Sequence, residues 1–578
     1  MRINVTLALA AGLFMAGMAE GTSAERLTIP QIQGDTHRSP HERAAVIVEG
    51  VVTHIFGNSF LVRDEAGDGN DATSDSILVR RKADGLVVGD RVRVEGIVRE
   101  WDAGGQPRTT TEIGSPVFRK LSSGAPLEPV IIGAGGRLSP TELLYVAEDS
   151  ADPAGSGADF YESLESTYVR ITNPVVVGPT NEYNEFWVVA ERGIGATGMN
   201  SLGGITATPG DGNPERIQIQ LTKAEAPEFQ LAVGDTFESI EGYVAYDRGL
   251  YEIRLAKATG AVPKDWSAAP IGAPADEAVL TVAGYNVENL DPVVERVERT
   301  PVDAPDDDVG KGKFTAIADH VVRLLGSPDV VALQEVQDND GGEYSDVVAA
   351  DATLGMLIDA IVAAGGPRYQ ALSIEPPDDT AGGQPGGNIR VAYLFNPDRV
   401  VADATALTQI DAPAFDRSRL PLVAQFRFRG RKVVMINVHL SSKGGSDAAY
   451  GMVQPPVDPS EPARTDQARA VRDHIRALPA DSQRSVVVLG DFNAYWYEAP
   501  MLLLTGGQPA FANLALDEPP EERISYVFEG NSQSLDHMLV LLGEGQSASM
   551  RTLHVNAVQP DSRKVSDHDP KLMRLVFP

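Results

Sequence analysis

The residues best suited to chemistry in this chain follow a short apolar run near the C-terminus. Ser485–Ala494 contains four consecutive apolar residues, then Gly490, and then Asp491 and Asn493. A run of mostly β-branched residues of this length is typical of a strand that is buried on both faces. Such a strand would deliver a carboxylate and an amide to the rim of a sheet. Together these groups can hold and orient one water molecule.

Other apolar segments also carry polar residues at one end. They are Ala278–Asn289 with Asn286 and Glu288, Asp329–Val336 with Glu335, Lys432–His439 with Asn437 and His439, Leu535–Val540 with Asp536, and the last apolar run, which follows Ser566, Asp567, His568 and Asp569. One such ending carries little information. Five of them indicate a shared rim, where ligands and catalytic groups usually gather.

The composition narrows the range of functions. The chain has 578 residues, of which 42% are hydrophobic, and this is enough for two to four globular domains. The lack of cysteine excludes disulfides, thiolate metal sites and cysteine nucleophiles. A formal charge of −32 argues against broad electrostatic binding of nucleic acid or anionic membranes. A polyanionic substrate is still allowed, because divalent cations can reverse the local field.

The N-terminus has the pattern of a secretory signal peptide, residues 1–24. Arg2 precedes the apolar run Val5–Met18, and small residues lead to a cleavage site before Glu25. The alternative is an uncleaved anchor, for which the run is short. We therefore expect a secreted or periplasmic protein. Since no later stretch approaches about 20 apolar residues, we expect no stable membrane insertion.

Alternating segments follow, and they predict two small β-modules over 25–130 and 131–265. The strands expected in the first are Ala45–Phe56, Ser59–Arg63, Ile77–Arg80 and Asp90–Glu100. A Gly-Asp turn followed by a Glu-Gly strand occurs at Gly89–Gly96 and again at Gly234–Gly242. This repeat favours two tandem modules, with one split barrel as the alternative.

Small barrels of this kind often bind single-stranded nucleic acid through a basic, aromatic face. In the first module the basic residues are Arg63, Arg80, Arg81, Lys82, Arg91 and Arg93, with Phe56 and Phe60 nearby in the sequence. The alternative interpretation is an ordinary solvated strand face.

Strands alternate with helical patterns over 276–578, which predicts a mixed α/β domain. Helices are expected at Phe314–Leu325, Leu354–Ala363 and Thr465–Leu478. Two long loops, Asp291–Lys311 and Ile374–Asn388, are long enough to border a substrate cleft or to be flexible insertions.

The strand-end motifs occur in the order found in the endonuclease/exonuclease/phosphatase superfamily, and 276–578 resembles its catalytic domain. The matching motifs are Tyr285–Asn289, Leu333–Val336, Asn437–His439, Gly490–Asn493, Leu535–His537 and Ser566–Asp569. The resemblance implies an α/β four-layer sandwich of two β-sheets flanked by helices. The preceding modules resemble the oligonucleotide-binding-fold (OB) regions of extracellular bacterial nucleases, so we expect OB-like β-barrels there.

The resemblance also implies roles for individual residues. Glu335 would be the principal ligand of Mg²⁺ (or Mn²⁺, with Ca²⁺ as a further candidate), and the residues beside the metal would be Asn286, Glu288 and Asp567. The catalytic residues would be His439, Asp491, Asn493, Asp536 and His568. In this scheme Asp491 and Asn493 orient the attacking water, Asp536 positions His568 against the phosphoryl oxygen, and His439 assists the leaving group.

Several residues along the same rim are candidates for holding substrate phosphates. They are Asn388, Arg390, Arg419, Lys443 and Arg464. Ordinary surface solvation is the alternative for each of them.

The expected function is that of a secreted, divalent-metal-dependent nuclease that hydrolyses DNA, with RNA as a second candidate substrate and no evident protein partner. One alternative keeps the chemistry and changes the substrate to phospholipids or small phosphoesters. The other is a non-catalytic secreted scaffold or adhesin.

Overall fold

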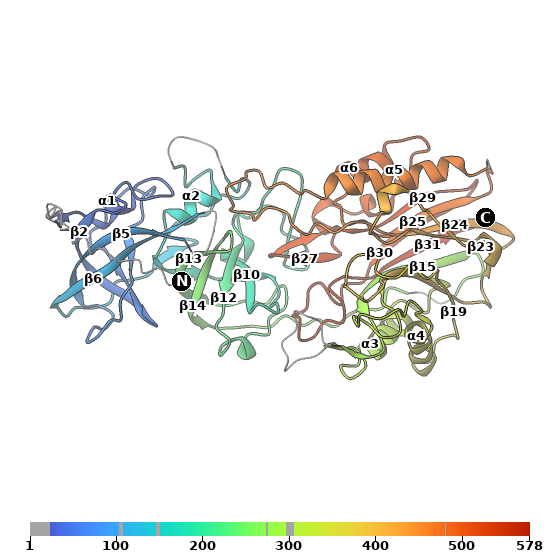
Figure 1. Ribbon diagram of the computed structural model, residues 1–578, viewed down its shortest axis with the longest axis horizontal. Helices are drawn as coiled ribbons and strands as arrows, with labels where there is room; N and C mark the ends of the chain where they lie inside the picture. Colours follow the sequence, from blue (N-terminus) through green and yellow to red (C-terminus); the bar gives the residue numbers. More distant parts are fainter. Residues whose placement is uncertain (1–23, 103–107, 146–150, 273–274, 296–305, 480) are drawn as a thin grey trace, which may run out of the picture. The chain divides into compact units, whose positions relative to one another are not determined.

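The computed structural model describes residues 24–102, 108–145, 151–272, 275–295, 306–479 and 481–578 (Figure 1). The predicted signal peptide, 1–24, lies outside these residues except for Ala24. The described residues form two compact units. The first runs to Asp102 and includes Thr109–Glu128, and the second contains Arg108 and Pro129–Pro578. Among the described residues, no helix combines the length and apolar character needed to cross a membrane.

The first unit is a six-stranded sheet with one short helix. Its elements are β1 (Glu25–Arg26), α1 (Ile29–Gln33), β2 (Ala45–Phe56), β3 (Ser59–Arg63), β4 (Ser76–Val79), β5 (Arg91–Trp101) and β6 (Thr110–Ser122). The strand order is β1-β2-β3-β4-β6-β5, and β2 also pairs with β5, so five strands form a closed ring of pairings. Alternate residues such as Val48, Phe60 and Val94 fill its core. All four strands expected from the sequence are confirmed to within one residue.

The basic residues of this unit are largely engaged by neighbouring groups. The ion pairs are Arg80–Glu112, Lys82–Asp84, Arg91–Glu65 and Arg93–Glu49. Arg63 and Arg81 donate hydrogen bonds to the carbonyl oxygens of Glu128 and Pro116. The predicted basic face therefore is not a band of free positive charge, and the solvated-face interpretation fits it better.

The second unit begins with a β-module, residues 130–259. Its elements are β7 (Val130–Ile132), α2 (Gly157–Glu162), β8 (Tyr168–Thr172), β9 (Val175–Gly178), β10 (Glu185–Val189), β11 (Ile205–Thr206), β12 (Ile217–Gln220), β13 (Ser239–Asp247) and β14 (Leu250–Thr259). Seven strands form one sheet in the order β7-β8-β13-β14-β12-β10-β9. Phe160, Ile171, Phe186 and Phe237 belong to its core.

The repeated Gly-Asp and Glu-Gly motif has the same local structure in both β-modules. Asp90 accepts a hydrogen bond from the amide three residues earlier, at 3.0 Å, and Asp235 does the same at 2.9 Å. Both Glu-Gly steps coincide with a register shift in the strand. At Gly242 a Cβ atom would lie 2.2 Å from the Arg254 carbonyl oxygen, which explains why glycine is required there.

One buried carboxyl makes the stability of this module depend on pH. Burial raises the pKa of Glu215 to about 7. The folded state binds the proton of the Glu215 carboxyl more tightly than the unfolded chain does. The contribution of this proton to folding stability is therefore present below the pKa of the unfolded chain and is lost as the pH rises through about 7. We expect Glu215→Gln to raise Tm more at pH 8 than at pH 5, and the full shift corresponds to about 3 kcal/mol. Thermal unfolding at both values measures this, and an equal effect at both would contradict it.

The rest of the second unit is an α/β sandwich. The strands of its first sheet are β15 (Val279–Leu290), β18 (Val330–Val336), β19 (Gln370–Leu372), β20 (Arg390–Phe395), β30 (Ser547–Thr552) and β31 (Lys571–Val576). The strands of its second sheet are β21 (Val401–Ala402), β22 (Thr408–Gln409), β23 (Leu422–Phe428), β24 (Arg431–His439), β25 (Ser485–Asp491), β26 (Ala512–Asn513) and β29 (Asp536–Leu541). Two small pairings lie outside these sheets, β16 (Val294–Glu295) with β17 (Asp306–Asp307), and β27 (Tyr526–Phe528) with β28 (Asn531–Gln533).

Side-chain alternation explains the four layers. Ala332 and Met435 face the core between the two sheets. On the outer face of the first sheet, Leu333 packs with helices α3 (Lys313–Asp319) and α4 (Asp351–Ala363). On the outer face of the second sheet, Val488 packs with α5 (Glu461–Ala477) and α6 (Ala499–Thr505) (Figure 1). The predicted four-layer sandwich is confirmed, as are the three predicted helices, the first of which continues as a π-helical turn, His320–Leu324.

The β-module and the sandwich are joined by specific contacts. Strand β11 of the module pairs in parallel with β28. Tyr450, from the loop between β24 and α5, packs into the core of the module. Arg216 of the module donates hydrogen bonds to the backbone at Asn213 and Glu529. The module is therefore integrated with the sandwich.

Candidate active site

Strand pairing brings the predicted side chains to one edge of the two sheets. Strands β24 and β25 run in parallel with His439 opposite Asp491, and β25 pairs with β29 so that Asp491 lies opposite Asp536. In the facing sheet, β15 pairs with β18 so that Asn286 lies opposite Gln334, next to Glu335. The shared-rim prediction thus follows from register, since paired residues on neighbouring strands lie about 5 Å apart.

The backbone at this edge adopts conformations that L-residues usually avoid. Glu288, Asn289, Glu335 and Asn493 have φ values of 49°, 50°, 59° and 48°. Register shifts interrupt both β15 and β18 where these residues occur. Each such residue costs on the order of 1–3 kcal/mol, and such strain typically clusters at functional sites. The bulges turn the side chains of Glu288 and Glu335 away from ordinary strand positions.

Gly490 permits the sharp end of strand β25. It has a φ of 126°, and a Cβ atom there would lie 2.2 Å from the carbonyl oxygen of Val438. The next residue is then fixed by local hydrogen bonds, because Asn493 donates from its backbone amide to Asp491 Oδ1 at 2.8 Å and from its side chain to Asp491 Oδ2 at 3.0 Å. Asp491 and Asn493 therefore form one rigid pair.

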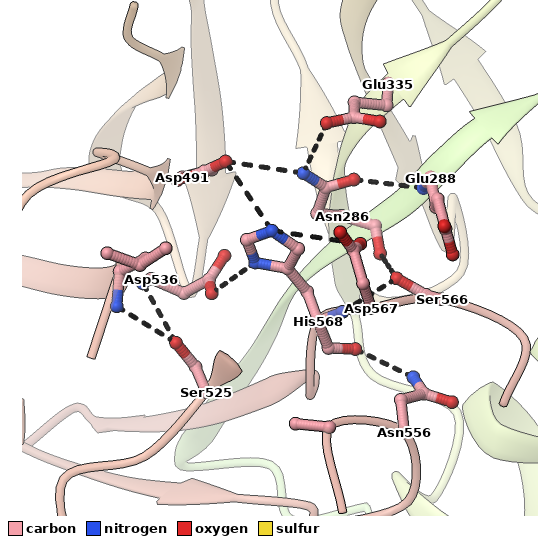
Figure 2. A network of polar contacts seen from close by, with 12 residues as sticks. Asn286, Glu288, Glu335, Asp491, Ser525, Asp536, Asn556, Ser566, Asp567 and His568 are labelled. Atoms are coloured by element: carbon pink, nitrogen blue, oxygen red, sulfur yellow. Dashed lines mark hydrogen bonds and ion pairs between the residues drawn. The ribbon is translucent and has the colours of Figure 1, made fainter. Parts of the chain in front are cut away.

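Asn286 connects the two sheets across the site (Figure 2). Its Nδ2 donates to Glu335 Oε1 at 2.9 Å and to Asp491 Oδ2 at 3.4 Å. Its Oδ1 accepts from the Glu288 amide at 3.0 Å. A single amide thus holds the carboxylates of Glu335 and Asp491 within reach of one ligand.

His568 and Asp536 form a buried charged pair. His568 Nδ1 lies 2.7 Å from Asp536 Oδ2, and the backbone amide of Asp536 donates to Ser525 Oγ at 3.1 Å (Figure 2). Burial alone would lower the pKa of His568, but the carboxylates of Asp536, Asp567 and Asp491 outweigh it and raise that pKa well above its ordinary value. These carboxylates therefore favour the protonated ring, whose Nε2 lies 3.9 Å from Asp491 Oδ2.

His439 has the opposite electrostatic character. Its Nε2 lies 3.4 Å from Asp491 Oδ2 and 3.7 Å from Glu335 Oε1. Burial, reinforced by the positive charges of Arg419 and His568, lowers the pKa of His439 well below its ordinary value. Two imidazoles held in different protonation states can divide the roles of proton donor and neutral hydrogen-bond partner.

The carboxylates gather more negative charge than the neighbouring residues offset. Burial raises the pKa of Asp491 to about 7, against the opposing effect of His568. Burial and then Asp567 raise the pKa of Glu288 to about 8, and the same two causes raise that of Glu335. Asp567 Oδ1 is buried and has no hydrogen-bond partner among the described residues.

This donor set fits a divalent cation. Glu335 with His439 and Asp491, and Asp491 with Asp536 and His568, present ligand atoms within 4.8 Å of one another. Oxygen donors from carboxylates and an amide suit hard cations. Asp567 Oδ1 has no hydrogen-bond partner among the described residues and lies 3.9 Å from His568 Nε2, so it is the kind of atom that an ion would satisfy. Asn286 contacts Glu335 directly, and the family resemblance implies Glu288 and Asp567 as further residues beside the metal.

Of the five predicted phosphate-binding residues, the structure brings Arg419 to the site. Its Nη2 donates to the Leu440 carbonyl oxygen at 2.8 Å, and its charge interacts with Glu335 and Asp491. Burial lowers the pKa of Arg419, which these two carboxylates oppose. The guanidinium Nε has no hydrogen-bond partner among the described residues, as is also true of Arg390 and Arg464.

The other four predicted phosphate ligands are engaged in structural contacts. Arg464 is fully buried and donates to the carbonyls of Ser441 and Ser442. Arg390 is buried and donates to the carbonyls of Val348 and Asn388.

The remaining two are held in the same way. The amide of Asn388 donates to Asp338 Oδ2 at 3.0 Å and to other oxygens. Lys443 is paired with Glu498 at 2.6 Å and Asp458 at 2.9 Å. These contacts hold surrounding loops in place, whereas the sequence had suggested that the same four residues bind substrate phosphates.

Two contacts at the site were not predicted from the sequence, that of Tyr526 and that of the amides Gln334 and Asn437. Tyr526 packs its ring on that of His568, with centroids 4.9 Å apart. Gln334 donates to Asn437 Oδ1 at 2.6 Å, and Asn437 donates to carbonyls of Leu333 and Ala392, so these amides link the sheets beneath the site. Asn437 is thereby structural, although it ends a strand. His537, of the Leu535–His537 motif, contacts Asn513 and the Ala494 carbonyl and is therefore structural.

Two family models match parts of this chain. Residues 285–568 match the model of the Endonuclease/Exonuclease/phosphatase family, and residues 131–264 match that of a domain of unknown function. No curated protein matches the chain. Among solved structures, humanized TDP2 of D. rerio is 18% identical with a TM-score of 0.36, covering 52% of this chain and 99% of its own.

Two further solved structures have the same coverage of this chain. The human Nocturnin catalytic domain with bound sulfate is 16% identical with a TM-score of 0.36, over 52% of this chain and 95% of its own. A Bacteroides thetaiotaomicron protein described by the same family name is 16% identical with a TM-score of 0.34, over 52% and 95%. Residues 285–568, which carry the whole polar cluster, therefore form an enzyme domain of the endonuclease/exonuclease/phosphatase family.

Proposed function

We propose that this protein is a secreted, divalent-metal-dependent phosphodiesterase that hydrolyses nucleic acid, with DNA as the first candidate substrate. The observation that carries the proposal is geometric: the His568 ring, oriented by Asp536 at 2.7 Å, lies beside the carboxylate cluster of Glu335 and Asp491. One group can stabilise negative charge on a phosphoryl oxygen and the other can hold a metal ion. The proposal of secretion rests on the N-terminal sequence.

The proposed roles follow from the contacts. Asp491, whose carboxylate is fixed by Asn493, accepts the proton of the attacking water. His568, oriented by Asp536, donates from Nε2 to a non-bridging oxygen of the phosphate. His439 and Arg419 lie beside the carboxylates and stabilise charge that develops on the leaving side. A bound Mg²⁺, held by Glu335, Asn286, Glu288 and Asp567, would supply charge neutralisation at the phosphate.

We propose that the strand ring of the first unit is an OB-like barrel that helps to position the catalytic domain. Its ion-paired arginines argue for this role over strong binding of nucleic acid.

The proposed reaction is tested with a panel of substrates. We expect purified protein with Mg²⁺ to cleave plasmid DNA or RNA, and chelation to stop the cleavage. The panel includes sphingomyelin and a phosphate monoester, because other phosphoesters suit the same chemistry. Turnover of the lipid or the monoester alone would overturn the nuclease assignment, and no turnover of any of them would favour the scaffold alternative.

A metal-site prediction has a readout that is independent of turnover. Glu335→Gln removes the negative charge at the centre of the proposed ligand set, and we expect Mg²⁺ affinity to fall by at least roughly 10- to 100-fold. Calorimetric titration and the rise of Tm with Mg²⁺ measure this. Glu544→Gln, on the loop after β29, is the matched control and should bind as wild type. Equal Mg²⁺ binding by Glu335→Gln and wild type would contradict the ligand assignment.

A further inference from the structure

His568 differs from the other residues of the site in the kind of backbone that carries it. His439, Asp491 and Asp536 belong to strands β24, β25 and β29. His568 lies in the connection 553–570 between β30 and β31, all of which the structure describes and which contains neither helix nor strand. Because no strand ladder fixes its backbone, other contacts must hold His568 in position.

Asp569, the residue after His568, organises the first part of this connection. It is buried, and its Oδ1 accepts hydrogen bonds from three consecutive backbone amides, those of residues 555–557, at 3.0, 2.8 and 3.1 Å. Its Oδ2 lies 2.9 Å from His554 Nδ1. Hydrogen bonds from amides to a carboxylate are among the strong ones in proteins. These three residues are therefore fixed next to His568.

Asn556, the middle one of the three, reaches back to His568. Its Nδ2 donates to the His568 carbonyl oxygen at 2.7 Å (Figure 2) and to Tyr285 Oη at 3.0 Å. Tyr285 Oη also lies 2.9 Å from His320 Nδ1. Burial lowers the pKa of His320 to about 4, so its ring is neutral and can accept the phenol hydrogen. Because Asn556 is fully buried, water cannot take the place of its side chain.

The partner of this clamp is strand β15, which also carries a residue of the proposed metal site. Tyr285 directly precedes Asn286 in that strand. Ser566 donates from Oγ to the Asn286 carbonyl oxygen at 2.7 Å, and its Oγ accepts from the His568 amide at 3.1 Å (Figure 2). Asn556 and Ser566 thus connect the carbonyl and the amide of His568 to two adjacent residues of β15.

The direction of the His568 ring depends on this backbone. Its Nδ1 lies 2.7 Å from Asp536 Oδ2, and its Nε2 lies 3.9 Å from Asp491 Oδ2. A hydrogen bond weakens steeply when its distance or angle changes, so a displaced backbone would loosen the contact with Asp536. A misplacement of about 1 Å in a reacting group can cost on the order of 10²-fold in rate.

We propose that Asn556 is a positioning residue, which fixes the backbone of His568 against β15 and so aims the imidazole at the phosphoryl oxygen. The inference rests on the proposed function, in which His568 donates to that oxygen. It adds to the site a residue that lies outside every strand-end motif of the sequence. Asn556 acts only through His568 and needs no contact with the substrate.

The test is a double-variant cycle on the full chain with the nucleic acid that wild type cleaves. We expect Asn556→Ala to lower kcat by roughly 10- to 100-fold with little change in KM. Asn556→Asp keeps the shape but faces the His568 carbonyl with an acceptor, so it should be as slow. His568→Ala/Asn556→Ala should be no slower than His568→Ala. A role in stability alone would slow wild type and His568→Ala by the same factor.

Asn200→Ala is the matched control. Asn200 is a buried asparagine of the β-module that donates to Thr206 Oγ1 at 3.1 Å and to Ser532 Oγ at 3.3 Å. Its loss should lower Tm, as the loss of Asn556 should, but leave kcat unchanged at a temperature where both variants are folded.

A readout without substrate is the low-field proton NMR signal of the hydrogen bond between His568 Nδ1 and Asp536. We expect the signal in wild type and Asn200→Ala, its absence in His568→Ala, and its shift or loss in Asn556→Ala. An unchanged signal in Asn556→Ala, or equal slowing of wild type and His568→Ala, would overturn the inference and leave the nuclease function intact. If wild type cleaves no nucleic acid, the proposed function fails, and the NMR signal still decides whether Asn556 positions the ring.

Discussion

Replacing Asp491 by Asn is expected to lower kcat by roughly 10²- to 10⁴-fold without unfolding the protein. Asparagine keeps the shape and can still accept the hydrogen bond from the Asn493 amide, but it cannot accept a proton from water. The loss should therefore appear in kcat, with a smaller effect on KM. Turnover of a DNA substrate and the thermal unfolding curve measure the two expectations.

The pH dependence follows from the same residue. Burial raises the pKa of Asp491 to about 7, and a general base must be ionised to work, so kcat/KM of wild type should fall as the pH drops through about 7. Asp398→Asn, an exposed carboxyl at the surface of the sandwich, is the matched control and should change neither rate nor profile. A fully active Asp491→Asn enzyme would require another base at the site.

The sequence was sufficient to predict the carboxylates and histidines of this site, and the physical reason lies in register. A buried strand such as β25 has one continuous apolar run, so the polar residue that ends it must lie at the sheet edge. Once His439, Asp491 and Asp536 are assigned to the ends of paired strands, their proximity follows without knowledge of the loops.

The arginines predicted to bind phosphate could not be assigned in this way, because they do not end buried strands. Arg419 interacts with carboxylates of the site, whereas Arg464, in helix α5, donates to the carbonyl oxygens of Ser441 and Ser442. The difference depends on how the chain between β24 and α5 folds back over α5, and no short-range pattern encodes that path. A long side chain with several donors serves either purpose.

The contacts that join the β-module to the sandwich could not be predicted from the sequence either. The junction depends on the two-residue strand β11 and on the carbonyl at Glu529. It also depends on Tyr450, which contacts Tyr161 and Tyr251 in the core from 289 and 199 residues further along the chain. Elements this short leave no periodicity to detect.

Removing the imidazolium is the second change with a large expected effect. His568→Ala should lower kcat by roughly 10²- to 10⁴-fold, because the positive charge that would face the phosphoryl oxygen is lost. The double variant His568→Ala/Asp536→Asn should be no slower than His568→Ala alone, since Asp536 acts through His568. Additive losses in the double variant would mean that Asp536 has an independent role.

The single variant Asp536→Asn is expected to shift the pH dependence of kcat in a defined direction. The carboxylate of Asp536 is the first of the groups that raise the pKa of His568 against the effect of burial. The proton donor is active below its pKa and is lost as the pH rises through it, so wild type should stay active well into the alkaline range. Without the negative charge of Asp536 the pKa falls, and the alkaline limb of the kcat profile should move to lower pH. Asp536 contacts His568 and Ser525 and not the substrate. If its role were only structural, Asp536→Asn would lower the stability of the fold and leave the alkaline limb of the kcat profile where it is in wild type.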